Sequence, residues 1–479
     1  MILSLFTTLI GGAALAGGPT EFTGELRVSG AQLTEIPLDA EGTVSGGEPW
    51  IDQRFRLGLG GEAGRFGMAV EADLFTGIIY GEPYAAIDER SRQAASADGF
   101  RPRKALLTFS PDFGRFAVGL TTSHWGLGML ANDGDTDPWF GQNELGDRTL
   151  RASLTTGAFG QENLYFTVAA DRVLADDIAR WTEEQAAWQG VGSLYYATAN
   201  TKAGVYGVYR YQREQAEDRT TRVGVADGFL DHTWEGPGVT WLRFQGEVAG
   251  ILGSTDRATT YSSRETIAVM SGGATGSLQL ISDEDQVWLV TTRAGWASGD
   301  ADPDDGVSRD FTFDREFDVG MVLFDQVLGR VEGATYDLLS DPGNSGQPPD
   351  GVDAIATEGA FRRAAFVQPI VDVNPHQILL LRAGVSASWA TAPHAQPFYT
   401  YRAGGTPTNH HNAVVDGRLL GTELNWLVSL HDFLHGTKNL SNIHPDLTVQ
   451  GGHLLVGPAL AGAGPDRIDL FLATGRLRW

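Results

Sequence analysis

Short runs in which apolar and polar residues alternate recur along most of the chain. In residues 51–59, one face of an extended strand is apolar and the other carries Asp52, Arg54 and Arg56. Similar runs occur at residues 22–29, 66–74, 105–109, 116–120, 150–154, 164–168, 379–389 and 420–430. Successive side chains of a strand point to opposite faces. Strands with one apolar face are typical of a wall between lipid and an aqueous lumen.

Short and long connections separate these runs. Short turns are expected near residues 61–65, 111–114, 157–162, 199–203 and 372–376. Long polar loops are expected near residues 32–49, 77–101, 123–148, 172–187, 213–236, 299–357 and 391–415. This asymmetry predicts an all-β fold, a transmembrane antiparallel barrel of about 18 strands with short periplasmic turns and long outer loops. Within residues 236–298 the pattern is less clear, and the count there could differ by two strands.

A soluble β-propeller is the rival fold, but the chain has no repeat of about 40 to 50 residues. Composition narrows the choice further. The chain has no cysteine, which excludes disulfides and thiolate metal sites. Its net charge of -25 argues against a nucleic-acid partner. No run of about 20 apolar residues follows residue 20, so membrane-spanning helices are excluded.

The two ends of the chain carry signals for secretion and assembly. Residues 1–16 are apolar and end in small residues, with Ala14 and Ala16 at the A-x-A positions. We expect a signal peptide over residues 1–16 and a single barrel domain over residues 17–479. A buried first helix is the alternative.

The last strand ends on an aromatic residue. Its predicted lipid face includes Phe471, Leu477 and Trp479. This pattern is typical of the C-terminal signal that the barrel-assembly machinery recognises. The alternative is an ordinary final edge strand. In a barrel, the last strand must also pair with the first, since lipid allows no open edge.

The predicted lumen face carries many charges. Its basic residues are Arg27, Arg54, Arg56, Lys104, Arg151, Arg243, Arg293, Arg382 and Arg476. Its acidic residues are Glu25, Asp52, Glu71, Asp73, Glu247 and Glu423. Since rings of basic residues select anions in pores, this face predicts a lumen that prefers anions. The alternative is that these charges pair with one another across the wall.

The loop at 299–357 is long enough to have its own structure or function. Apolar residues occupy much of the stretch from Val319 to Leu328 and must be buried somewhere. We expect this loop to fold into the barrel mouth as a constriction. An extra pair of strands is the alternative.

Two outer loops contain closely spaced acidic residues. They are Asp133, Asp135 and Asp137 in one loop and Asp300, Asp302 and Asp304 in the other. Such spacing predicts calcium binding, although neither run matches a full calcium loop. Solvated acidic loops, or loose bridging by divalent ions beside lipopolysaccharide, are the alternatives. No other cofactor is expected.

Histidine and serine residues offer few signs of catalysis. His410 and His411 are adjacent, but the sequence shows no spacing to a third metal ligand. Ser123 with His124, and Ser429 with His431, are only nominal nucleophile–base pairs. Because no G-x-S-x-G motif is present, we do not expect an enzyme.

Three further motifs support a family resemblance. They are Ala294–Asp300 (AGWASGD), Gly421–Trp426 (GTELNW) and Trp125–Gly134 (WGLGMLANDG). With the strand count, they make the chain resemble the alginate-export-type porins of proteobacteria and a related myxobacterial barrel family. The resemblance implies a passive outer-membrane channel for anionic solutes or an acidic polysaccharide.

We therefore expect an integral outer-membrane channel in a Gram-negative bacterium. Its expected partners are membrane lipid, lipopolysaccharide, the barrel-assembly machinery and a small solute or polysaccharide. The alternative is a barrel with a filled lumen that acts as a surface enzyme, adhesin or structural protein.

Overall fold

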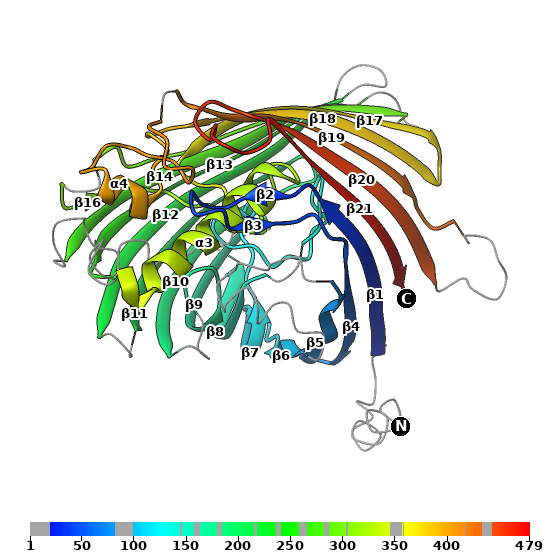
Figure 1. Ribbon diagram of the computed structural model, residues 1–479. Coiled ribbons are helices and arrows are strands. Elements are labelled where there is room, and N and C mark those ends of the chain that lie inside the picture. The colour runs from blue at the N-terminus through cyan, green and yellow to red at the C-terminus, as the bar shows by residue number, and fades with distance from the viewer. Residues whose placement is uncertain are drawn as a thin grey trace.

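The computed structural model describes residues 20–81, 99–143, 146–157, 163–179, 184–214, 218–235, 241–257, 266–281, 287–302, 305–344, 357, 359–415, 417–433 and 443–479. Eighteen long strands close into one antiparallel barrel (Figure 1). They are β1 (Thr20–Leu33), β4 (Trp50–Ala63), β5 (Phe66–Tyr80), β6 (Gly99–Phe109), β7 (Arg115–Thr122), β8 (Arg148–Gly157), β9 (Leu164–Ala175), β10 (Gln185–Ala197), β11 (Thr201–Glu214), β12 (Arg219–Glu235), β13 (Trp241–Thr255), β14 (Ile267–Ile281), β15 (Trp288–Ala297), β17 (Ala364–His376), β18 (Leu379–Ala390), β19 (Leu419–Leu430), β20 (His444–Val456) and β21 (Arg467–Arg478).

The barrel closes because its last strand pairs with its first. The β1–β21 register runs from Glu25 opposite Arg478 to Leu33 opposite Leu470. Each other long strand pairs with the long strands before and after it in the chain. Closure satisfies the backbone groups of both edges, as lipid requires. The predicted antiparallel barrel of 18 strands is confirmed.

Alternation along the strands separates an apolar outer face from a polar inner face. Leu107, Val205 and Val248 point outward and are 62%, 57% and 59% exposed. In β12 and β13, by contrast, Asp227 and Glu247 point inward and are buried. Exposed rows of large apolar side chains are costly in water and favourable in lipid.

One expected outer loop is wrong. Residues 213–236, predicted to be a loop, are mostly strand, since β11 ends at Glu214 and β12 begins at Arg219. The polar side chains of β12 face the lumen, which makes this strand look like a loop in the sequence. The open region 236–298 contains three strands, β13, β14 and β15.

Several shorter elements lie within the ring of long strands or beside the strand ends (Figure 1). A small hairpin joins β2 (Ile36–Pro37) to β3 (Val44–Ser45). In the loop at 299–357, β16 (Val307–Ser308) is followed by η2 (Leu323–Leu328), α3 (Gly329–Ser340) and η3 (Pro342–Asn344). A further helix, α4 (Pro397–Arg402), follows β18. Within its described part, the loop at 299–357 therefore contains three helical segments and the two-residue strand β16, and no extra pair of strands.

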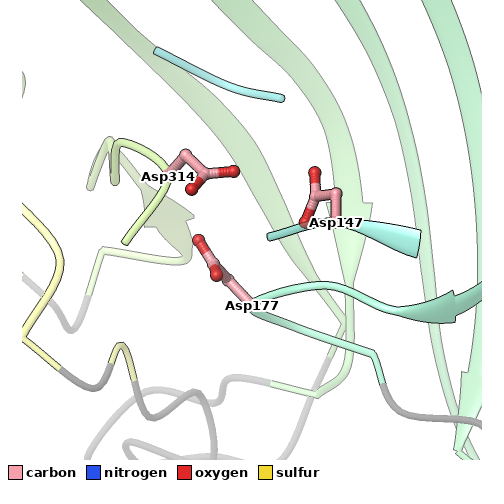
Figure 2. A group of neighbouring side chains, drawn as sticks. All are labelled: Asp147, Asp177 and Asp314. Carbon is pink, nitrogen blue, oxygen red and sulfur yellow. The ribbon is translucent and has the colours of Figure 1, made fainter. Parts of the chain in front are cut away.

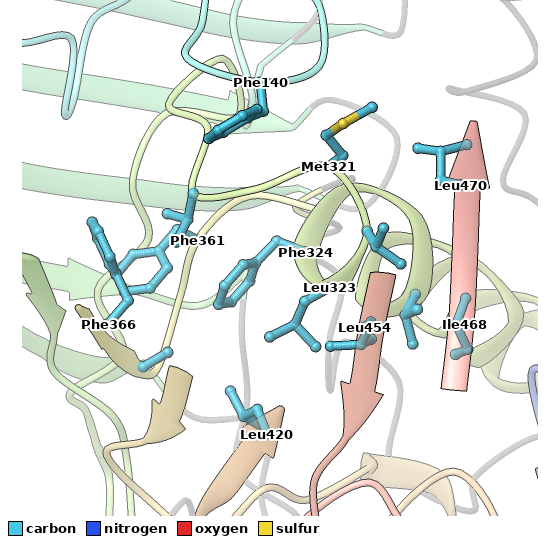
Figure 3. Close-up of a cluster of buried hydrophobic side chains, with 14 of the residues drawn as sticks. Phe140, Met321, Leu323, Phe324, Phe361, Phe366, Leu420, Leu454, Ile468 and Leu470 are labelled. Carbon is cyan, nitrogen blue, oxygen red and sulfur yellow. The ribbon is translucent and has the colours of Figure 1, made fainter. Parts of the chain in front are cut away.

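The main apolar core lies between these inner segments and the barrel wall. Figure 3 shows Phe324 and Leu323 of η2 facing side chains from the strands. Wall residues in this cluster are Phe366, Leu420, Leu454, Ile468 and Leu470. The apolar stretch 319–328 is thus buried against one side of the wall. No helix in the described ranges is long and apolar enough to cross a bilayer.

Candidate functional site

The loop between β7 and β8, residues 123–147, contacts widely separated parts of the wall. Near its start, the indole of Trp125 donates a 2.8 Å hydrogen bond to Asp227 of β12. Near its end, the carbonyl of Asn143 accepts hydrogen bonds from Arg27 of β1 and Arg54 of β4. The loop therefore crosses the lumen and narrows it.

The loop also forms ion pairs with the wall. Asp135 lies 2.7 Å from Arg56 and 3.2 Å from Lys104. Arg56 is paired at 2.6 Å with Asp73, and Lys104 at 3.3 Å with Glu71. These predicted lumen residues come together in one network of alternating charge.

The remaining predicted basic residues fall into two groups. Most have a carboxylate partner within 4 Å: Arg54 with Glu25, Arg151 with Asp171, Arg243 with Asp231, Arg382 with Asp372, and Arg476 with Asp137. Arg27 and Arg293 donate hydrogen bonds to the backbone carbonyls of Asn143 and Asp318. Arg293 also lies over the rings of Phe317 and Phe366. Ion pairing therefore compensates much of the positive charge on the wall.

Glu423 holds the segment at 321–323 in place. Its carboxylate accepts hydrogen bonds from the backbone N–H groups of Met321, Val322 and Leu323 at 2.6, 3.0 and 2.9 Å. Glu423 is 1% exposed. This predicted lumen residue lies beneath the inward-folded segment, away from bulk solvent.

One important inward residue was missed by sequence reasoning. Arg103 is 1% exposed and pairs with Glu71 at 2.8 Å and with Asp135 at 2.6 Å. Strict alternation would place it opposite Lys104, facing lipid. The register of β5 and β6 shifts at Glu71 and Ala72, where a bulge turns both neighbours inward. No periodic signal marks this bulge.

Three aspartates from different loops meet inside the barrel (Figure 2). Asp147 comes from the loop 123–147, Asp177 from the loop after β9, and Asp314 from the segment before η2. One carboxylate oxygen of each lies within 4.8 Å of the others. Asp147 and Asp177 are partly exposed, whereas Asp314 is buried. Of all His, Cys, Asp and Glu side chains in the described ranges, only these form a group that could hold a metal ion.

Burial and mutual repulsion make these carboxyls weak acids. Burial raises the pKa of Asp177 to about 7. Burial, and then repulsion from neighbouring carboxylates, raises the pKa of both Asp147 and Asp314 well above the ordinary value. Asp314 accepts backbone hydrogen bonds from Asn132 and Glu316. A cation among the three would favour their ionised forms. Because the three aspartates are far apart in the sequence, no local motif indicates that they meet.

The two predicted calcium runs adopt other contacts. Asp133 lies 3.4 Å from His124, and Asp137 is paired with Arg476. The hydrogen bond to Asp133 is the main reason that the pKa of His124 is raised. Asp300 accepts backbone hydrogen bonds from Asp302 and Arg309. Asp304 lies outside the described residues. Within the described part of either run, the carboxylates do not converge on one point.

In the histidine pair, His410 is buried and His411 is partly exposed. His410 is 3% exposed, and burial lowers its pKa to about 2. Its ring lies 4.0 Å from that of His411. The two ring planes are tilted by 40°, and a neutral, buried imidazole fits a packing role as well as a ligand role.

Neither nominal catalytic pair has the geometry of a triad. The Ser123 hydroxyl accepts a hydrogen bond from Arg151. Nδ1 of His431 lies 3.5 Å from the Ser429 hydroxyl and 3.7 Å from Asp446. Because one nitrogen makes both contacts, this imidazole is not held by Asp446 while its other nitrogen takes a proton from Ser429.

The expected assembly residues lie at the barrel seam. Phe471 and Leu477 are exposed on the outer face. The backbone carbonyl of Trp479 accepts a 2.9 Å hydrogen bond from Gly24, and its N–H donates to Gly24 at 3.1 Å. A β-carbon on Gly24 would overlap the Trp479 ring. The last residue thus continues the pairing that closes the barrel.

Solved structures give the only similarity found. The chain matches no family model, and no curated protein is similar to it in sequence. OccAB1 of Acinetobacter baumannii superposes with a TM-score of 0.55 at 9% identity, covering 96% of both chains. OccK11 of Pseudomonas aeruginosa superposes with a TM-score of 0.52 at 12% identity, covering 96% of this chain and 95% of that chain.

A third similar structure is OpdK of Pseudomonas aeruginosa, solved with vanillate. It has a TM-score of 0.51 and 10% identity, and covers 96% of this chain and 98% of that chain. These neighbours are outer-membrane porins with 18-stranded barrels. At such low identity the likeness shows a shared fold. The broader resemblance to large outer-membrane barrels is supported, whereas alginate export is not among these findings.

Proposed function

We propose that this chain is an outer-membrane channel for small hydrophilic solutes. The observation that carries the proposal is the partial exposure of charged side chains on the inner face of a closed wall. Side chains of Lys104, Arg243 and Asp135 retain 26%, 32% and 32% of their exposure. Charges inside a barrel remain exposed only where water reaches them. A filled lumen would bury them.

The ion pairs on the lumen wall affect the expected ion selectivity of the channel. Anion preference was expected from the number of inward guanidinium groups. In the described residues, however, most of these groups have carboxylate partners, which cancels much of their field. In the group of Asp147, Asp177 and Asp314, by contrast, the negative charge is not fully neutralised by neighbouring basic side chains. We propose that ionised carboxylates of this group make the channel prefer cations or solutes with cationic groups.

An anionic substrate is the second candidate. It is favoured by the vanillate in the OpdK structure, because vanillate is an aromatic carboxylate. An acidic polysaccharide would follow from the resemblance to alginate-export-type porins. Either anionic substrate would use the same channel architecture. The channel would then prefer anions, whereas the first proposal has it prefer cations.

Planar-bilayer recording of the purified protein tests the proposal. We expect stepwise conductance and, in a salt gradient, a reversal potential of cation-selective sign. Asp177→Asn should shift that potential toward zero. Asp112→Asn is the matched control, because Asp112 is 89% exposed in a turn, where it pairs with Arg65. Absence of conductance would favour the filled-lumen alternative. Anion selectivity, or block by vanillate, would favour the second candidate.

The same proposal implies a location and partners. We propose integration in a bacterial outer membrane after removal of residues 1–16, with lipid and lipopolysaccharide around the outer face. Assembly would use the barrel-assembly machinery through the end of β21. Calcium binding at Asp133, Asp135, Asp137, Asp300, Asp302 and Asp304 stays a prediction, and equilibrium dialysis with radioactive calcium would test it.

A further inference from the structure

The start of the loop 123–147 is attached to two buried carboxyl groups. The Trp125 indole donates to Oδ1 of Asp227, and the Leu127 backbone N–H donates to Oε2 of Glu247. Asp227 and Glu247 are 5% and 3% exposed. They belong to the neighbouring strands β12 and β13, whose register brings their side chains together. The loop therefore rests directly on this carboxyl pair.

The other oxygen of each carboxyl lacks a donor. Oδ2 of Asp227 and Oε1 of Glu247 are buried and have no hydrogen-bond partner of good geometry, although the Met129 backbone N–H also approaches the Glu247 carboxyl. The two carboxyls nevertheless contact each other in a hydrogen-bonding arrangement. Two ionised carboxylates only accept hydrogen bonds. A single proton on either oxygen would satisfy both.

Ionisation of both groups would be costly. Like charges in contact within a buried site strongly oppose a second ionisation. No described basic side chain forms an ion pair with either carboxyl; the nearby Arg243 pairs with Asp231. We propose that Asp227 and Glu247 share one proton, and that this proton fixes the Trp125 corner of the loop 123–147 to the barrel wall.

The surroundings of the pair fit a dedicated anchor. Trp125 stacks on Tyr206 of β11 at 5.1 Å and meets Tyr195 of β10 edge-on at 6.2 Å. Gly204 lies beneath the indole, and a β-carbon there would approach Trp125 to 2.7 Å. Gly126 has a φ of +58°, and its missing β-carbon leaves room for the Glu247 carboxylate. Both glycines allow a close approach that a side chain would block.

Other titratable groups around the anchor are paired, more distant or uncharged. Within the loop, His124 precedes Trp125 and lies 3.4 Å from Asp133, which raises its pKa, and Asp147 acts on Tyr206 from the end of the loop. Arg151 of β8 and Asp171 of β9 face Tyr206 and pair with each other at 2.7 Å. From β14, Thr275 lies opposite Glu247 and carries no charge. Tyr195 and Tyr206 are neutral at ordinary pH. Because His124 pairs with Asp133 and not with Asp227 or Glu247, the shared proton is the titratable element between the two carboxyls, and the Glu247→Gln and Asp227→Asn variants separate its effect from that of His124.

A direction of pH dependence follows. The attached loop holds one proton that two hydrated carboxylates would release. Because the attached state binds more protons, rising pH favours detachment. Once the free carboxylates are ionised, the equilibrium between detached and attached loop shifts toward detachment by up to about tenfold per pH unit. Detachment would move the loop that crosses the lumen, so the pair is a pH-sensitive anchor of the constriction.

Oxidative footprinting of Trp125 in the folded, full-length protein tests this anchor without relying on transport. The oxidation rate would be followed by peptide mass spectrometry from about pH 5 to about pH 9. We expect the rate at Trp125, relative to other tryptophans, to rise with pH. Glu247→Gln and Asp227→Asn each supply an amide N–H in place of the proton. Both variants should keep the rate low at every pH.

Asp137→Asn is the matched control, since it removes a carboxylate from the same loop but not from the anchor. It should retain the pH response of the parent protein. A flat pH profile in the parent protein would overturn the proposal. An unchanged rise in both Glu247→Gln and Asp227→Asn would also overturn it. The heat-modifiable gel shift of folded barrels establishes that each variant is assembled.

Discussion

Arg330 of α3 donates a 2.6 Å hydrogen bond to the hydroxyl of Ser45 in β3. Arg330 is fully buried and also lies over the Trp50 ring of β4, 5.7 Å from its centroid. The contact joins segments 285 residues apart in the chain. It fastens the inner helix to the β2–β3 hairpin and to the wall.

Arg330→Met should loosen α3 without preventing barrel assembly. The change removes a buried, charge-assisted hydrogen bond, worth about 1.5 to 3 kcal/mol, and leaves the Ser45 hydroxyl without this donor. Limited proteolysis of the folded barrel should cut within α3 faster than in the parent protein. Arg309→Met is the control, because Arg309 forms a more exposed ion pair with Asp305. Equal cleavage rates in both variants would contradict this role.

Glu423 is expected to stabilise the segment at 321–323. Glu423→Ala leaves three buried N–H groups unpaired, with a cost of about 1 to 3 kcal/mol for each group. Glu423→Gln keeps an acceptor oxygen and should cost less. Hydrogen exchange at Met321, Val322 and Leu323 measures the effect. We expect exchange to be fastest in Glu423→Ala, slower in Glu423→Gln and slowest in the parent protein.

Deletion of Trp479 should impair assembly. The residue forms two backbone hydrogen bonds to Gly24 at the seam, and its ring lies 6.1 Å from that of Phe55. Without it, β21 loses its terminal pairing with β1. We expect a lower fraction of the heat-modifiable, folded band in membranes. Trp479→Phe retains the aromatic end and should assemble better than the deletion.

Signal-peptide cleavage is a prediction from the sequence alone, because residues 1–16 lie outside the described ranges. N-terminal sequencing of protein extracted from outer membranes should begin at Gly17. A sequence that begins at Met1 would show that the segment is retained.

The period-two pattern predicted the fold well because each strand had to satisfy lipid on one face. Leu57 and Leu59, for example, could not exchange faces with Arg56 without placing a charge in lipid. The same rule failed where the lipid constraint is interrupted. The bulge beside Arg103 turns consecutive residues inward, and polar β12 looks like a loop although it is a strand.

The site was less predictable because its parts come from distant loops. Asp147, Asp177 and Asp314 meet only after the barrel has closed and three separate connections have come together inside it. Likewise, Asp227 was not singled out, although Glu247 was placed on the inner face. Alternation gives the side of the wall for each residue. It does not give the partner across the lumen.

The three-aspartate group should make selectivity depend on pH. Each carboxyl is neutral in its protonated form, and the pKa of Asp177 is raised to about 7 by burial. Charge therefore appears as pH rises through about 7, and cation preference should increase over that range. Folding stability, in contrast, should decrease as pH rises over the same range. A carboxyl with a raised pKa favours the folded state at low pH, and that contribution is lost as pH rises through the folded pKa.

Reversal potentials in a salt gradient, recorded from about pH 5.5 to about pH 8.5, measure the selectivity. Asp177→Asn removes the group that titrates near 7 and should flatten the profile. Asp112→Asn, outside the lumen, should leave it unchanged. Thermal unfolding of the same variants measures stability separately from selectivity. The parent protein should become less stable as pH rises, and Asp177→Asn should show a smaller decrease. A parent channel whose anion preference grows with pH would show that other charges control the path.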